Sequence, residues 1–133
     1  TLQLGNDIFD VYKDYREGIY TLVTMETRIR NLRRIFHTTL NETYSLAYKC
    51  PYPKRNIRRF LRYISLCTCR MFVCLDYLDK TSRKTGGVFK PEEYSRSQLI
   101  CDMDKPANFL KSVLYAVKYN YKAGSQAGSQ HSN

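Results

Sequence analysis

The stretch PKRNIRRFLRYISLCTCRMFVC, residues 53–74, carries six basic residues and three of the chain's five cysteines. Its apolar residues recur on one face at the spacing of three and four that is typical of a helix: Ile57, Phe60, Leu61, Ile64 and Met71. As far as Arg62 the opposite face carries arginine, and beyond Ile64 it becomes apolar as well. We therefore predict a helix from about Pro53 to Lys80 with an amphipathic, basic first half and an apolar second half.

The segment before this helix contains no proline until Pro51. Its apolar residues again recur in steps of three or four: Ile8, Tyr12, Tyr15, Ile19, Leu22, Met25, Ile29, Leu32, Phe36, Leu40, Tyr44 and Ala47. Pro51 and Pro53 end the pattern, because proline lacks the backbone donor and restricts the residue before it. We predict one long N-terminal helix, or two that are broken near Gly18 or Asn31. Either arrangement forms a hairpin with the helix from Pro53.

Two shorter helices are predicted after a basic loop at residues 81–90. Pro91 suits the first turn of a helix that reaches about Met103, and Pro106 suits the first turn of the next. The last helix carries an apolar stripe: Phe109, Leu110, Val113, Leu114, Val117 and Tyr121. No segment alternates convincingly like a strand. The prediction is an all-α fold of about four helices, with one domain over residues 1–122 and a disordered Gly/Ser/Gln tail over residues 123–133.

The net charge of +10 is concentrated in one part of the 133-residue chain. From Arg28 to Arg70 there are eleven Lys or Arg residues and one acid, Glu42. This bias favours a polyanionic partner, with nucleic acid first and an anionic membrane surface or an acidic protein as alternatives. A solvated face that only keeps the protein soluble is the remaining interpretation.

Arginine is the residue best suited to phosphate, because its planar guanidinium can donate two parallel hydrogen bonds. We predict nucleic-acid binding by the following residues: Arg28, Arg30, Arg33, Arg34, Lys54, Arg55, Arg58, Arg59, Arg62 and Tyr63. The hairpin would bring the two basic clusters into partial overlap, and interleaved tyrosines could stack on unpaired bases. The sequence contains no motif that is typical of base-specific recognition, so we predict binding to the nucleic-acid backbone. The sequence does not distinguish DNA from RNA, or single strands from double strands.

The apolar second half of the helix from Pro53 indicates a buried surface. Leu66, Cys69 and Val73 lie on the side that the arginines occupy further toward the N-terminus. We predict that these three residues form an interface in a homo-oligomer, which the twelve tyrosines of the chain would also favour. An ordinary core helix is the equal alternative.

The cysteines follow no metal-binding pattern. CxxC pairs are absent, and Cys69 would point about 160° away from Cys67 on a helix. We predict core thiols, with no metal and no cofactor; a disulfide that involves Cys50 or Cys101 is the alternative. Reduced cysteines favour an intracellular location, in the nucleus, the cytoplasm or a virion. Secretion is the alternative, since the chain begins at Thr1 rather than Met and Asn41 begins a glycosylation sequon.

No catalytic constellation stands out. His37 has no evident nucleophile or carboxylate partner in the sequence, and the loop at residues 81–90 lacks the GxxxxGK[ST] pattern of a phosphate-binding loop. We predict a non-catalytic, basic structural protein that acts in packaging or assembly, as in a virion or nucleoprotein. The alternatives are a helical protein–protein interaction module, secreted or not, and a matrix-type protein on an anionic membrane.

Overall fold

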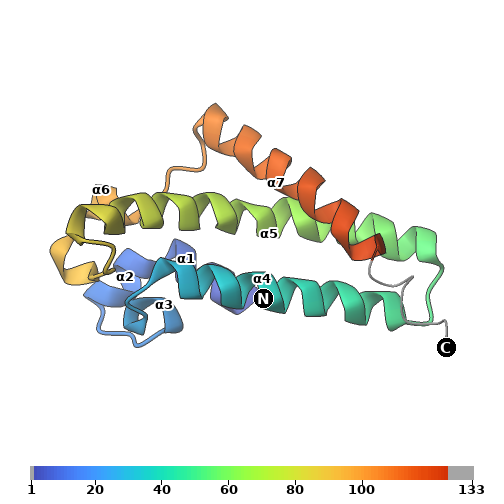
Figure 1. The fold of residues 1–133 in the computed structure, drawn as a ribbon, viewed down its shortest axis with the longest axis horizontal. Coiled ribbons are helices and arrows are strands. Elements are labelled where there is room, and N and C mark those ends of the chain that lie inside the picture. Colours follow the sequence, from blue (N-terminus) through green and yellow to red (C-terminus); the bar gives the residue numbers. More distant parts are fainter. Residues whose placement is uncertain (1, 126–133) are drawn as a thin grey trace.

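A computed structural model describes residues 2–125, and these residues form an all-α fold without strands (Figure 1). Four of the seven α-helices have seven or more residues. The elements in chain order are α1 (Leu2–Phe9), α2 (Val11–Arg16), α3 (Leu22–Met25), α4 (Ile29–Lys49), α5 (Lys54–Ser82), the 3-10 helices η1 (Arg83–Thr85) and η2 (Pro91–Glu93), α6 (Arg96–Leu99) and α7 (Pro106–Ser125). Most of the predicted disordered tail, residues 126–133, lies outside the described residues.

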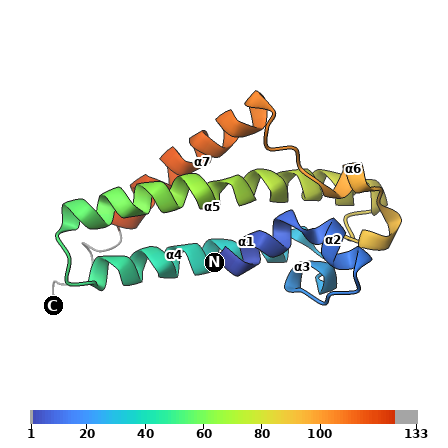
Figure 2. The same ribbon diagram turned by 180° about the vertical axis from the view of Figure 1, so that it is seen from behind.

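Helices α4 and α5 form the predicted antiparallel hairpin, side by side in both views (Figures 1 and 2). Cys50 ends α4 with an extended backbone (ψ 145°), as expected for a residue before proline. Pro53, also extended, immediately precedes α5. At 29 residues, α5 is about 43 Å long and contacts most of the other elements, so it forms the axis of the molecule.

The predicted long N-terminal helix is interrupted at Asp10, at residues 17–21 and at residues 26–28, so the segment forms four helices rather than one or two. The second of these breaks contains Gly18. Gly18 has a positive φ of 67°, and the amide of Ile19 donates to the carbonyl of Asp14 at 2.8 Å. This is the Schellman end of a helix, which needs a residue that tolerates the left-handed conformation. Thr21 then caps α3 through a reciprocal pair of bonds with Thr24, and α4 begins at Ile29.

The interruption lets the N-terminal segment fold back onto α5. Ile8 is buried there, and Gly5 meets Met71 so closely that a Cβ on Gly5 would lie 2.9 Å from the Met71 Cε. Helix α1 therefore packs directly against the Met71 side chain of α5, and a side chain at position 5 would need Met71 to move. Val11 and Val23 complete the buried apolar set of the N-terminal segment.

The helix predicted from Pro91 to Met103 is wrong in extent. Pro91 begins only the 3-10 helix η2, because Tyr94 and Ser95 take extended conformations. Ser95 then starts α6 through a capping box with Gln98, and Ile100 ends it after one turn. Phe89 holds the loop between η1 and η2 against the rest of the fold. Its ring is buried, and its amide donates to the Thr27 carbonyl at 2.7 Å.

The centre of the core lies where α4, α5 and α7 meet. The Phe36 and Phe72 rings pack edge to face with centroids 5.1 Å apart, and Tyr115 stacks on the other side of Phe72 at 5.4 Å. Helix α7 starts above the middle of α5 and descends along its N-terminal half (Figures 1 and 2). Phe72 therefore joins the hairpin to the C-terminal helix.

Candidate nucleic-acid interface

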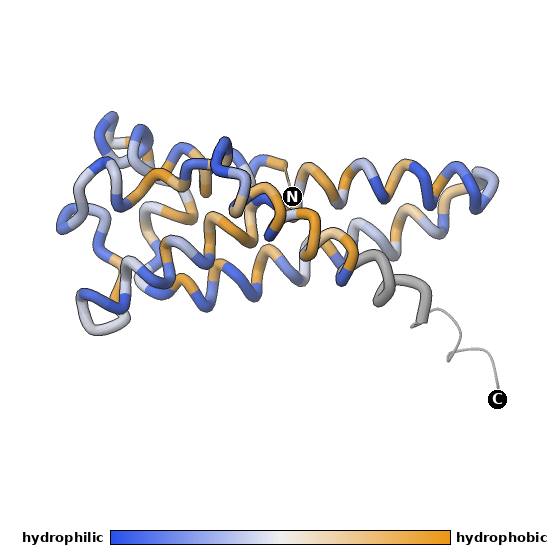
Figure 3. Tube along the Cα trace, turned by 90° about the horizontal axis from the view of Figure 1, so that it is seen from above, coloured by the Kyte–Doolittle hydropathy of each residue, from blue (hydrophilic) through white to orange (hydrophobic). Residues whose placement is uncertain are grey.

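One group of basic residues lies at the turn of the hairpin, which we call the hairpin tip. Its members are exposed and come from the end of α4 and the start of α5: Lys49, Lys54, Arg55, Arg58, Arg59 and Arg62. None of them forms an ion pair with a carboxylate among residues 2–125. Figure 3 shows hydrophilic residues gathered at this end of the molecule. The hairpin tip is therefore a concentrated positive charge that the fold leaves open to solvent.

The arginines of the tip share one face of α5. At 100° per residue, Arg55, Arg58, Arg59 and Arg62 span about 100° of the helix circumference over about 10 Å. The opposite side of the same turns is held by Ile57 and Leu61, which are buried. Burial of this apolar side is what directs the guanidinium groups outward. The resulting ridge suits successive phosphates of a nucleic-acid backbone.

Two tyrosines border the tip with exposed rings. Tyr52 lies in the turn between the helices and Tyr63 on α5, and both are more than half exposed. They can stack on unpaired bases. Tyr44 cannot, because it is buried and its hydroxyl is hydrogen-bonded to Ser65 Oγ; burial also raises its pKa. Lys49 joins the tip although sequence reasoning missed it; its position in the last turn before Pro51 was the available signal.

The second predicted cluster lies at the other end of the hairpin. Arg28, Arg30 and Arg34 are exposed near the start of α4, which the antiparallel pairing places beside the end of α5. Arg33 pairs with Asp76 there, and Asp76 lies fourteen residues after Arg62, about 21 Å along α5. The predicted overlap of the two clusters is therefore wrong: they occupy opposite ends.

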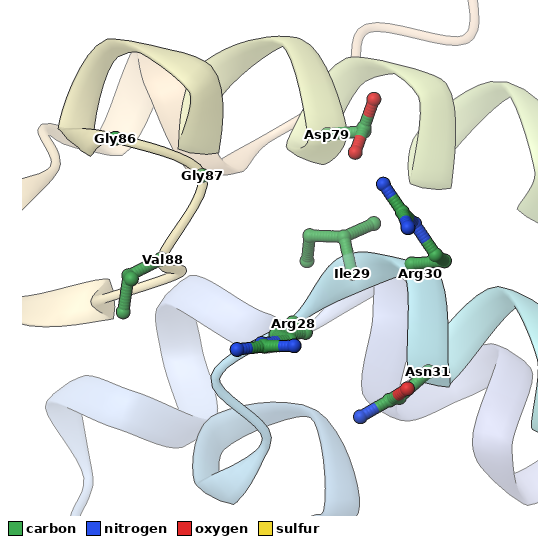
Figure 4. Close-up of a pocket in the computed structure, with 8 residues that line it drawn as sticks. All are labelled: Arg28, Ile29, Arg30, Asn31, Asp79, Gly86, Gly87 and Val88. Carbon is green, nitrogen blue, oxygen red and sulfur yellow. The ribbon is translucent and has the colours of Figure 1, made fainter.

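A cavity of about 300 Å³ lies between this second cluster and the loop after α5. Its lining consists of Arg28, Ile29, Arg30, Asn31, Asp79, Gly86, Gly87 and Val88 (Figure 4). The Arg30 side chain extends toward Asp79, which also accepts a hydrogen bond from Arg83 at 2.7 Å (Figure 4). Glu26 accepts from the Arg28 amide at 2.9 Å at the start of α4. The carboxylates of Asp79 and Glu26 offset part of the positive charge around the cavity, whereas no carboxylate within residues 2–125 pairs with a cation of the hairpin tip.

Arg33, predicted to contact phosphate, has a structural position instead. Its guanidinium bonds Asp76 and lies 5.9 Å from the Phe72 ring centroid. The Tyr115 hydroxyl donates to the other Asp76 oxygen at 2.8 Å. Burial, and then the bond to Asp76, raise the pKa of Tyr115, so the hydroxyl keeps its proton. Arg33, Asp76 and Tyr115 thus connect α4, α5 and α7.

Replacing Arg33 by alanine is expected to lower the free energy of unfolding by about 1–2 kcal/mol, because it leaves the Asp76 carboxylate without its charged partner. The matched control is Arg83→Ala. Arg83 also pairs with an aspartate of α5, but its side chain is largely exposed, so the expected loss is under about 0.5 kcal/mol. Urea unfolding followed by circular dichroism measures both. Equal losses would contradict the structural role of Arg33.

Two of the three predicted interface residues are inside the monomer. Cys69 and Val73 are 0% and 3% exposed, whereas Leu66 is 47% exposed. The core interpretation is therefore correct for Cys69 and Val73, because α7 packs along α5. Of these three residues, Leu66 alone is exposed enough in this conformation to contribute to a contact with another chain.

All five cysteines are free thiols. Burial raises the pKa of Cys69 to about 12. The thiols of Cys74 and Cys101 form a hydrogen bond with each other. This bond raises the pKa of Cys74, and burial raises it further; the same bond lowers the pKa of Cys101. Cys50 and Cys67 are exposed, so the prediction of core thiols is wrong for these two and correct for Cys69 and Cys74, which are buried.

Among residues 2–125, no group of three or more His, Cys, Asp and Glu side chains is placed to hold a metal ion. None of the helices within the same residues combines the length and the apolar character needed to cross a bilayer. Searches against protein-family models, curated proteins and solved structures found no match for this chain.

Proposed function

We propose that this protein binds the phosphate backbone of nucleic acid through the hairpin tip, without base preference, and acts in packaging or assembly rather than in catalysis. The observation that carries the proposal is the group of six exposed, unneutralised cations at one end of the hairpin. A single charged side chain on a surface is common. Six cations that are grouped within three turns of α5 and the connection from α4 attract a polyanion strongly.

The start of α5 strengthens this attraction. Pro53 precedes the helix and supplies no side-chain cap, and its carbonyl accepts from the amides of Asn56 and Ile57. The amides of Lys54 and Arg55 come before these two and have no partner in an earlier helical turn. The helix dipole also places partial positive charge at this end. Arg55 therefore lies in the first turn, where backbone amides favour phosphate, and Arg58, Arg59 and Arg62 continue the same face over the next two turns. Tyr52 and Tyr63 add stacking surfaces that suit a single strand.

Fluorescence anisotropy with labelled single- and double-stranded DNA and RNA tests the proposal across a salt series. If all six cations contact phosphate, the logarithm of the association constant should fall against the logarithm of salt with a slope of about −5 on duplex DNA. The strand that binds most tightly then identifies the nucleic acid. Absence of binding at low salt to every probe would overturn the proposal.

An anionic membrane surface is the second candidate. Phe60 is 56% exposed on the same helix as the tip arginines, and an apolar ring beside basic residues suits lipid headgroups. Co-sedimentation with phosphatidylserine-containing vesicles, but not with neutral ones, would support this candidate. Competition by an oligonucleotide would show whether both ligands use the tip.

We also propose that the protein functions as a homo-oligomer. Cys69 and Val73 cannot provide the contact in this conformation because they are buried within one chain. A large exposed apolar surface is required for a stable interface between copies.

A further inference from the structure

Helix α7 packs on α5 through its small and polar side. Ser112 and Ala116 are buried, at 3% and 2% exposed, and Tyr115 reaches Phe72 and Asp76 from the same side. Small residues allow α7 to approach α5 closely. The packing of α7 within the monomer therefore uses little of the apolar surface that the helix carries.

The large apolar side chains of α7 point away from the monomer. Phe109, Leu110, Leu114 and Val117 are 54 to 61% exposed, and they lie along one side of the helix. Figure 3 shows that hydrophobic residues recur along α7. The apolar stripe predicted for this helix is thus real, but it faces solvent rather than the core. We call these four residues the α7 stripe.

The area of the stripe matches that of an interface. Four large side chains, each more than half exposed, present roughly 400 Å² of apolar surface, at the upper range for one patch on a monomer. A standard interface buries about 800 Å² on each partner, of which a little over half is apolar. The stripe with its polar borders therefore supplies what one side of a stable dimer needs.

We propose that the α7 stripe packs antiparallel against the α7 stripe of a second copy of this chain, forming a two-fold symmetric homodimer. A symmetric contact uses the same patch twice, so a single self-complementary helix face is sufficient. The inference specifies the surface for the self-association proposed above and does not depend on nucleic-acid binding.

The charges at the two ends of α7 select the antiparallel orientation. Asp102, Asp104 and Lys105 precede the helix; Lys105 pairs with Asp102 at 4.0 Å, so this end keeps the negative charge of Asp104. Lys118 follows the stripe and is exposed, as Asp104 is. Antiparallel packing brings the acidic end of one copy toward Lys118 of the other, and it also opposes the helix dipoles favourably. Parallel packing would place like charges together.

The dimer would separate the two hairpin tips. Within one chain the C-terminal half of α7 lies along the N-terminal half of α5, so α7 runs toward the tip (Figures 1 and 2). Two antiparallel copies of α7 therefore direct their tips to opposite ends. Such a dimer can hold two nucleic-acid segments at once, which is a property that packaging requires.

Sedimentation velocity of the full chain over a range of concentrations, without nucleic acid, tests the dimer. Wild-type protein should show a monomer–dimer equilibrium, and Leu110→Glu combined with Leu114→Glu should raise the dissociation constant at least 100-fold. The control is Leu46→Glu, because Leu46 is equally exposed, at 62%, but lies on α4. Circular dichroism checks that each variant remains folded. The control should leave the dissociation constant unchanged.

The antiparallel orientation of the two α7 helices is tested by charge reversal. The same experiment tests the dimer if the variant with glutamate at positions 110 and 114 does not fold. Asp104→Lys and Lys118→Glu should each weaken the dimer about 3-fold, and the combined variant should recover the wild-type dissociation constant. Additive weakening would overturn the antiparallel arrangement.

The remaining outcomes overturn the proposal in distinguishable ways. A monomer at every concentration would remove both the dimer and the self-association. If the Leu110/Leu114 variant dimerises as well as the wild-type protein, the protein self-associates through a surface other than the α7 stripe. Wild-type protein that stays monomeric yet sediments with anionic vesicles, and loses this in the Leu110/Leu114 variant, would make the stripe a lipid-binding surface. Anisotropy with an oligonucleotide separately reports the tip, whatever the dimer does.

Discussion

Replacing Arg58, Arg59 and Arg62 together by glutamate is expected to lower nucleic-acid affinity by at least about 100-fold at physiological salt. The three arginines lie on the exposed ridge of the hairpin tip, and none is engaged by a carboxylate within residues 2–125. Their loss removes three phosphate contacts, so the slope against salt should become shallower by about 3 on duplex DNA. Anisotropy titrations over the same salt series measure both quantities.

The matched control reverses the same number of charges at the other end of the hairpin. Arg28, Arg30 and Arg34 are also exposed, but they lie more than two Debye lengths from the tip at physiological salt. Their replacement by glutamate changes the net charge identically and should reduce affinity several-fold at most. Equal losses in the two triple variants would show that binding follows net charge and would contradict the assignment of the hairpin tip.

Replacing Phe72 by alanine is expected to lower the free energy of unfolding by about 3–5 kcal/mol, which approaches the total stability of many small domains. Phe72 is 1% exposed and lies between Phe36 and Tyr115, so its removal opens a cavity where three helices meet. Chemical unfolding monitored by circular dichroism measures the loss, and a variant that is unfolded in buffer satisfies the expectation.

The control for Phe72 lies on the same helix. Phe60 is 56% exposed, and its replacement by alanine should change the free energy of unfolding by no more than about 0.5 kcal/mol. The two substitutions are chemically identical and differ in burial. A large loss for Phe60→Ala would mean that its ring is covered, for example by another molecule of the same protein.

The local pattern of residues predicts the elements of this fold well where a strong signal ends them. Pro51 and Pro53 end α4 and precede α5, and Pro106 begins α7, as expected from the loss of a backbone donor. Gly18 was recognised only as one of two alternative breaks. The apolar period continues across it through Tyr15, Ile19 and Leu22, yet these residues are exposed in the structure. Periodicity alone does not show where a helix turns back.

The candidate site was predictable in composition but not in arrangement. The arginines of α5 form one exposed face because Ile57 and Leu61 require burial, and this follows from the sequence alone. Arg33 belongs to the same basic block, but Asp76 pairs with it from 43 residues away. A contact between residues so distant in the chain depends on how two helices align, which no local pattern specifies.

The all-α class, the hairpin with its proline turn and the basic face at the start of α5 can be read from the residues alone, because they depend on propensity and on spacing within one element. Long-range packing sets the rest: Arg33 is paired with Asp76, Cys69 and Val73 are buried, and α7 turns Ser112 and Ala116 inward and its large apolar residues outward. An amphipathic helix has one apolar side, and this side can be covered either by the core of its own chain or by a neighbouring chain. Which of the two covers it depends on how closely the helices of one chain pack together.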